Sequence, residues 1–146
     1  MDLLASTRLH VYRCFVDAGC APSAAETAAV LGESLEAIEA AYRQMAESHI
    51  LVLHPNSLEI WMAMPFSNVP TPFHVSSGGR SWYANCAWDA FGIPALLGAG
   101  ANITTTCADC GESIEIGIRD GRLSRSSGVV HFALPPSRWW EDIGFT

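Results

Sequence analysis

The chain has 146 residues, a formal net charge of −7, and a composition that is 49% hydrophobic and 16% charged. This length suits one domain or two small lobes that share a core, and the hydrophobic content excludes extended disorder. The acidic balance disfavours nucleic-acid binding, which depends on basic residues that neutralise phosphates.

No apolar stretch of the sequence reaches the length of a membrane span, and the N-terminus lacks the basic start and apolar run of a signal peptide. We therefore expect a cytoplasmic protein with no membrane partner. The five cysteines are odd in number. In a reducing compartment they favour free thiols or metal ligands over a disulfide framework.

Residues 1–64 have the element order of a winged helix, which is three helices followed by a hairpin. The spacing of apolar residues predicts a first helix over residues 7–18. Ser23–Glu26 has the pattern of a capping box, which opens a short helix that ends at Gly32. Ser34 caps a third helix. Two short strands follow, at 50–54 and 58–64, and a Pro-Asn-Ser turn joins them.

The third helix of this lobe, residues 34–47, takes the place of the recognition helix in a DNA-binding winged helix. It carries Glu36, Glu39 and Glu47 against a single basic residue, Arg43. A helix that enters a major groove usually brings basic residues to the phosphates and bases. We therefore expect a structural or interaction role for this lobe, and no binding of nucleic acid.

Proline, serine and glycine are frequent in residues 65–80, which we predict to be an extended connector over the surface. Residues 81–146 form the second lobe, with a helix over 83–97 that Pro94 kinks or divides. The strands expected after this helix are residues 102–106, 113–119 and 129–134. The predicted fold class is therefore α+β: a winged-helix-like lobe, then a lobe of one helix and a small antiparallel sheet.

The most informative residues are Cys86 and Asp89, at the start of the helix in the second lobe. Residues three apart share a face of a helix, so the thiol and the carboxyl can point the same way. A thiolate binds soft metals, and a carboxyl beside it can carry a proton. The pair therefore indicates chemistry on a metal-bound group. A buried cysteine and an aspartate that favours the helix dipole would give the same pattern.

The motif Cys107-Ala108-Asp109-Cys110-Gly111 has the spacing of a metal knuckle. One knuckle supplies two of the four ligands of a structural zinc site. His74, His131, Cys14 or Cys20 would have to supply the rest. We favour a tight turn with two thiols over a zinc site, although zinc or another soft metal at Cys107 and Cys110 stays open.

Aromatic residues of the second lobe are candidates for an apolar wall around a ligand, or for core packing. His131 lies in an alternating stretch, and we expect it to be a core residue. The candidates for the substrate pocket are Trp82, Trp88, Trp139 and Trp140.

The segment Arg80–Asp89 (RSWYANCAWD), followed by Ile93–Gly98 (IPALLG), resembles the core motif of the organomercurial (alkylmercury) lyases. The N-terminal lobe fits the same family, so the resemblance covers most of the chain. Its supporting segments are Thr106–Cys107, the turn at Gly111, Val130–Pro135 and Trp139–Trp140.

This resemblance implies an enzyme that cleaves carbon–mercury bonds and needs no cofactor. Its substrate would be a small organomercurial or another organometal, and its partners external small thiols. The family's catalytic set is two cysteines and one aspartate. Cys86 matches the first cysteine, Asp89 the aspartate, and Cys107 a further, more structural cysteine. The second catalytic cysteine of the family follows a position like Phe145, and the sequence here ends at Thr146.

In the implied mechanism, Cys86 binds mercury as a thiolate and Asp89 relays a proton to the carbon. Two adjacent acids in an apolar site are expected to share a proton near neutral pH. Two other functions stay open. One is a non-catalytic protein that binds a soft metal or metalloid through Cys86, Asp89, Cys107 and Cys110. The other is a winged-helix regulator that responds to metal, which the acidic third helix disfavours.

Overall fold

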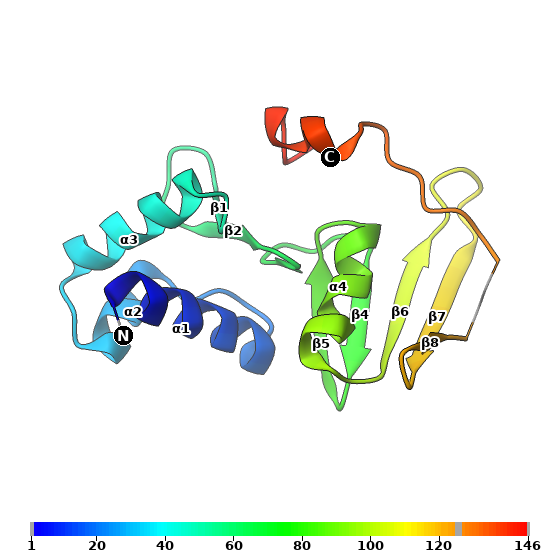
Figure 1. Cartoon of the computed structure of the whole chain (residues 1–146), viewed down its shortest axis with the longest axis horizontal. Helices are drawn as coiled ribbons and strands as arrows, with labels where there is room; N and C mark the ends of the chain where they lie inside the picture. Colours follow the sequence, from blue (N-terminus) through cyan, green and yellow to red (C-terminus); the bar gives the residue numbers. More distant parts are fainter. Residues whose placement is uncertain (1, 125–126, 146) are drawn as a thin grey trace.

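The computed structural model describes residues 2–124 and 127–145, and it shows a helical cluster beside an antiparallel sheet (Figure 1). The helices are α1 (Leu3–Ala18), α2 (Ala24–Leu31), α3 (Leu35–Glu47), α4 (Ala87–Leu97) and the 3-10 helix η1 (Pro136–Glu141). The strands are β1 (Val52–Leu53), β2 (Ile60–Ala63), β3 (Phe66–Ser67), β4 (His74–Ser77), β5 (Arg80–Ala84), β6 (Ala101–Thr106), β7 (Ser113–Arg119) and β8 (Arg122–Leu123). This content confirms the predicted α+β class.

Side-chain caps define the starts of the first three helices. Helix α1 begins four residues earlier than predicted, because Asp2 Oδ1 accepts a hydrogen bond from the Ala5 amide at 2.8 Å. The predicted capping box is confirmed, since Ser23 and Glu26 each accept from the other's backbone N–H. Ser34 caps α3, also as predicted. These short-range bonds satisfy amides that have no partner inside the helix.

The helical cluster packs around a buried core that joins it to the sheet. Phe15 of α1 is stacked on Phe66 of β3, with ring centroids 5.3 Å apart. The Tyr42 hydroxyl of α3 is hydrogen-bonded to the Thr27 hydroxyl at 2.7 Å, which satisfies a polar group inside this core. Three helices followed by the β1–β2 hairpin match the predicted element order, and the winged-helix assignment stays a prediction.

The eight strands form one sheet in the order β1-β2-β3-β5-β4-β6-β7-β8, and every neighbouring pair is antiparallel. The expectation of a surface connector over residues 65–80 is wrong, because this segment supplies β3 and β4. Phe66 and Val75 are both fully buried. Their apolar side chains place the segment in the middle of the sheet, despite the prolines and glycines around them.

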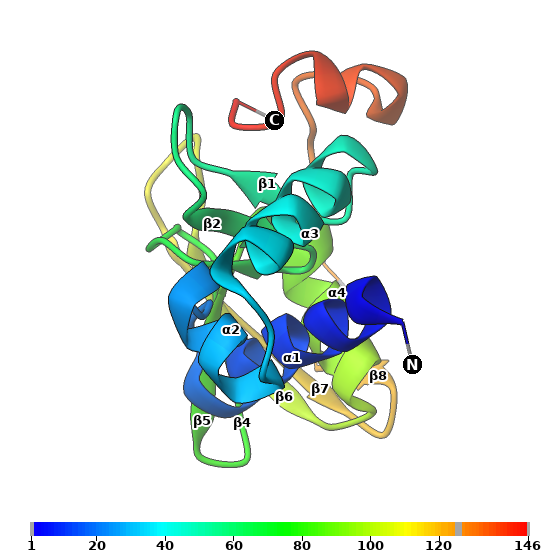
Figure 2. The same ribbon diagram turned by 90° about the vertical axis from the view of Figure 1, so that its left-hand side faces the viewer.

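Helices α1 and α4 pack on the same face of the sheet (Figures 1 and 2). Side chains that alternate toward this face include Val75, Trp82 and Ile103, all buried and all in one core with Ile93 of α4. Helix α4 starts at Ala87, later than predicted, because the preceding residues pair as β5. It continues through Pro94 without being divided.

The predicted strand over residues 129–134 is absent from the described structure, where this segment is irregular. Its side chains are mostly exposed: Val129 keeps 94% of its surface, and His131 lies on the outside and not in the core. The short β8 takes the place beside β7 instead. An alternating sequence makes a strand only where a neighbouring strand can pair with it. Within the described residues, no helix is both long enough and apolar enough to span a membrane.

Candidate functional site

Cys86 and Asp89 lie at the junction where β5 ends and α4 begins. Cys86 is the N-cap residue of α4, with an extended backbone, and Asp89 is in the first turn of the helix. The Cys86 Sγ is 3.8 Å from Asp89 Oδ2, within hydrogen-bonding reach for sulfur. The predicted approach of the two groups is therefore present, but it joins the N-cap residue to the third helical residue and not two residues on one helix face.

Asn85 holds the carboxyl of Asp89 in this position. Its side-chain Nδ2 donates to Asp89 Oδ2 at 3.1 Å and lies 3.2 Å from the backbone oxygen of Phe66. The amide thus ties the first turn of α4 to strand β3. Sequence reasoning missed Asn85. Its place directly before the cysteine at a helix start is the only local signal, and that signal is weak.

Burial raises the pKa of the Asp89 carboxyl above its ordinary value, and hydrogen bonds from Asn85 and Cys86 offset part of this rise. Burial also raises the pKa of the Cys86 thiol. The neighbouring amides of Asp89 and Trp88 lower it, and the carboxylate of Asp89 raises it. Both acids therefore resist losing their protons, and the pair can keep a shared proton closer to neutral pH than exposed groups could.

The site is closed on one side by α1 and by the turn between β2 and β3. Tyr12 of α1 donates its hydroxyl to the Met64 carbonyl at 2.9 Å. Burial raises the pKa of Tyr12, Arg8 lowers it, and Asp89 raises it further, which places the phenol within the field of the carboxylate. Gly92 lets α4 approach this turn closely, since a Cβ there would lie 3.2 Å from Pro65.

One buried acceptor at the site has no partner in the structure. The Oδ1 atom of Asn85 is buried and makes no hydrogen bond among the described residues. Buried polar atoms are usually paired, and leaving one unpaired is destabilising. This oxygen can therefore accept a hydrogen bond from a group that enters the site, such as a thiol or a water molecule.

Two of the four tryptophans expected in a pocket lie near the site in sequence but differ in exposure. Trp82 is 4% exposed and donates its Nε1 to the Phe15 carbonyl at 2.7 Å. It is therefore a core residue that joins β5 to α1. Trp88 is 67% exposed, between Cys86 and Asp89 on α4. Only Trp88 of these two is available to an incoming molecule.

The other two tryptophans lie in η1, close to the end of the chain. Trp140 is stacked on His49, with ring centroids 3.8 Å apart, so it packs against the end of the helical cluster. Trp139 donates its Nε1 to the Leu134 carbonyl at 3.0 Å and contacts Phe132. Local packing therefore accounts for much of the position of these two rings.

Cys107 and Cys110 occupy the turn between β6 and β7. The turn is closed by hydrogen bonds from the Gly111 amide to Cys107 O at 2.9 Å and from the Cys107 amide to Glu112 O at 2.8 Å. The backbone amides of Cys110 and Asp109, and then the Cys110 thiol, lower the pKa of the Cys107 thiol. Among the described residues, no three His, Cys, Asp or Glu side chains cluster as a metal site. Zinc at this turn is therefore not shown.

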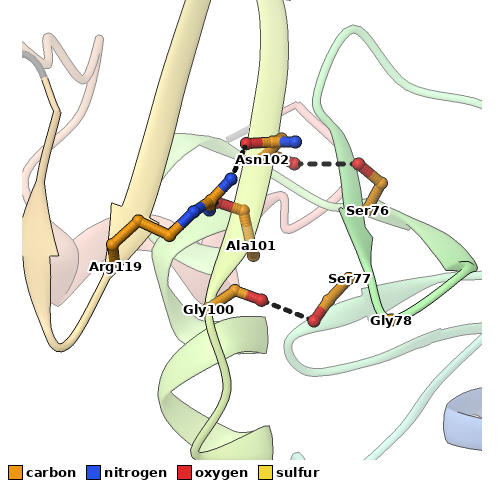
Figure 3. Close-up of a pocket in the computed structure, with 7 residues that line it drawn as sticks. All are labelled: Ser76, Ser77, Gly78, Gly100, Ala101, Asn102 and Arg119. Carbon is orange, nitrogen blue, oxygen red and sulfur yellow. Dashed lines mark hydrogen bonds between the residues drawn. The ribbon is translucent and has the colours of Figure 1, made fainter.

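A hollow of about 260 Å³ lies between the ends of strands (Figure 3). The pairing of Ser77 with Arg80 places it at the opposite end of β4 and β5 from Cys86. The strand ends that line it contribute Ser76, Ser77, Asn102 and Arg119. Ser77 donates to Gly100 O at 2.5 Å, and the Arg119 guanidinium donates to Ala101 O and Asn102 Oδ1 at 2.9 and 3.0 Å. The protein itself already uses these polar groups, so the hollow is a poorer candidate than the Cys86 site.

Comparison with known proteins relates the chain to one family. The family model described as alkylmercury lyase (MerB) matches residues 66–146, which is more than half of the chain. Alkylmercury lyases of Bacillus cereus and Clostridium butyricum are each 34% identical to it over 70 residues. The lyase of Staphylococcus epidermidis is 33% identical over the same length.

The matches to these curated lyases cover 46% of this chain and 32% of each relative. The chain thus spans about a third of their length. A solved structure, described as the mercury-bound form of MerB2, superposes with a TM-score of 0.64 at 23% identity. That match covers 82% of this chain and 59% of the other, and it supports the fold.

Proposed function

Because this chain belongs to the alkylmercury lyase family, we propose that it cleaves carbon–mercury bonds by protonolysis, with Cys86 as the mercury-binding thiolate and Asp89 as the proton relay. The observation that carries this proposal is the 3.8 Å approach of Cys86 Sγ to Asp89 Oδ2 in a partly buried site. A soft cation held on the sulfur would lie beside a carboxyl that can supply a proton.

The first step is binding of the substrate. In R–Hg–X, the Cys86 thiolate forms a sulfur–mercury bond, and the weaker ligand X leaves as an anion. The thiol proton passes to Asp89, whose raised pKa favours accepting it. Asn85 keeps the carboxyl turned toward the sulfur during this exchange, since it donates to the same oxygen, Oδ2.

The second step breaks the carbon–mercury bond. Asp89 delivers its proton to the carbon, the bonding electron pair stays with that carbon, and R–H leaves. The mercuric ion stays on Cys86. A second thiolate, from a small external thiol, would complete its coordination and make the carbon a better proton acceptor before cleavage. The exposed ring of Trp88 offers an apolar surface for the organic group.

The test is incubation of the protein with phenylmercury and excess glutathione, followed by measurement of benzene. Cys86→Ser should abolish benzene release above background. Cys20→Ser is the matched control, because Cys20 is an exposed thiol on the helical cluster. If wild type and Cys86→Ser release the same amount of benzene, the lyase function is wrong for this chain.

A binding function without turnover is the second candidate. It is favoured by the single sulfur at the site, since none of the interactions of Cys86 joins it to another cysteine in the part of the chain that the structure describes. In the same experiment it would give a stable complex of one phenylmercury per chain and no benzene. Loss of that complex in Cys86→Ser would assign the binding to this thiol.

A further inference from the structure

The β6–β7 turn presents two thiols side by side. Cys110 is exposed and Cys107 is partly exposed, so a solute can reach both. Two backbone amides, those of Asp109 and Cys110, approach the Cys107 sulfur, and the Cys110 thiol lies within hydrogen-bonding reach of it. The hydrogen bonds from the Gly111 amide to Cys107 O at 2.9 Å and from the Cys107 amide to Glu112 O at 2.8 Å close the turn around the two cysteines. The backbone therefore places two sulfur ligands on one tight turn.

Strand register places this turn at the same end of the sheet as Cys86. Tyr83 of β5 and Thr104 of β6 both pair with His74 of β4. Cys86 and Cys107 each follow their paired residue by three positions, on strands that run in the same direction. One strand separates β5 from β6. Two strand spacings, about 10 Å, separate Tyr83 from Thr104, so Cys86 and the β6–β7 turn follow their strands at the same end of the sheet.

The two sites also lie on the same face of the sheet. The hydrogen bond from the Cys107 amide to Glu112 O extends the pairing of β6 with β7 by one residue, so alternation puts Cys107 on the same face as Ile103. Ile103 is buried in the same core as Ala90 and Ile93 of α4. The face that Cys107 shares is therefore the one that α4 covers, and Cys86 is the N-cap of that helix.

The donor set selects the class of ion. Within the described residues there is no third His, Cys, Asp or Glu that would complete a site of three or four ligands. Structural zinc needs four ligands. Two thiolates without further donors suit a soft cation that is satisfied by two sulfurs, and soft ions prefer thiolate over nitrogen or oxygen.

We propose that Cys107 and Cys110 form a second soft-cation site, which accepts the mercuric ion after it has been released from carbon at Cys86. The identity of the ion rests on the proposed function, whereas the existence of a two-sulfur site does not. In the transfer, two sulfur–mercury bonds form at the turn, and the bonds to Cys86 and to its external co-ligand break. The two thiol protons displaced from the turn go to those two sulfurs, so no electron is gained or lost.

The test measures binding of Hg²⁺ itself to full-length protein in a Cys86→Ser background, with glutathione as competitor. We expect this variant to retain about one Hg²⁺ per chain after gel filtration. Adding Cys110→Ser should weaken retention by about 100-fold or more, since one chelating partner of high effective concentration is lost. Adding Cys20→Ser, which removes an exposed thiol elsewhere, should leave retention unchanged. Circular dichroism of each variant verifies folding.

Three results would overturn the proposal. One is equal Hg²⁺ retention with and without Cys110. Another is stoichiometric zinc in the purified protein that Cys110→Ser removes, which would indicate a complete zinc site. The third is loss of Hg²⁺ retention when Cys20 is replaced by serine. Benzene release by the protein with Cys86 intact is measured separately, so failure of the turn site and failure of the lyase function give different results.

Discussion

The two thiol regions of this molecule differ in the direction of their pKa shifts. At the start of α4, burial raises the pKa of Cys86 and also the pKa of the neighbouring Asp89. At the β6–β7 turn, amides lower the pKa of Cys107. The same side chain thus holds its proton more tightly in one place and gives it up more readily in the other. What differs is whether the surroundings offer apolar contacts or N–H groups.

This contrast fits two different tasks. A reaction that ends by protonating carbon needs a proton held beside the metal, which a partly buried pair of acids provides. Capture of a soft ion is helped by a sulfur that loses its proton readily and is open to solvent. Four measurements, with expected effects from large to small, test whether the two regions differ in this way.

Replacement of Asp89 by asparagine should have the largest effect. Asp89→Asn keeps the shape and the hydrogen bond with Asn85 but removes the proton relay. Benzene release in a single turnover should fall by about 100- to 10,000-fold, the usual contribution of a general acid. Binding of phenylmercury to Cys86 should change far less. Asp120→Asn, at an exposed turn, is the control, and an equal loss there would contradict the assignment.

Alkylation should separate the two thiols in rate. With iodoacetamide near pH 7, Cys107 should react about tenfold faster than Cys86 or more, because its pKa is lowered whereas burial raises that of Cys86. Peptide mapping by mass spectrometry measures both rates in one sample, with exposed Cys20 as a reference for access. Labelling of Cys86 as fast as Cys107 would remove the contrast between the regions.

Asn85→Ala should have a moderate effect on turnover and a distinct effect on its pH dependence. The hydrogen bond from Asn85 lowers the pKa of Asp89, so its loss should raise that pKa further. We expect the high-pH limb of the benzene-release profile to move to higher pH. The maximum rate should fall roughly three- to tenfold, because the carboxyl of Asp89 is no longer held in position. A lower rate with no movement of the limb would leave Asn85 a structural residue only.

Stability should change least, and in the opposite direction to activity. The folded state raises the pKa of Asp89 above 3.8, so it binds the proton more tightly than the unfolded chain does. Stability from this group is therefore present below that value and is lost as pH rises through the folded pKa. Asp89→Asn should raise the Tm at pH 7 by on the order of 1 to 3 °C. The gain should shrink at pH 5, and a gain that grows there would contradict the raised pKa.

Local sequence was enough for some features of the fold and the site. The capping box at Ser23–Glu26 and the pairing of Cys86 with Asp89 each depend on residues three apart. In each pair the first residue is the N-cap of a helix and the second is its third helical residue, and cap geometry brings the side chains at these two positions together. The turn at Cys107–Gly111 is local in the same sense.

Other features depended on contacts far along the chain. The segment 65–80 forms strands of the sheet, and its Phe66 and Val75 are buried in the core. The alternating segment 129–134 forms no strand, and no strand pairs with it in the described structure. Strand formation needs partners that a local pattern does not reveal.

The sequence by itself determined that a thiol and a carboxyl would lie three residues apart at the start of a helix, a spacing at which the side chains of an N-cap residue and of the third helical residue come within reach. Only the tertiary structure decided their chemistry. Packing of α4 against the sheet and against the β2–β3 turn partly buries Cys86 and Asp89, and Asn85 is hydrogen-bonded to both Asp89 and Phe66. Proton affinity depends on solvation and on neighbouring dipoles, and both are set by residues distant in the chain.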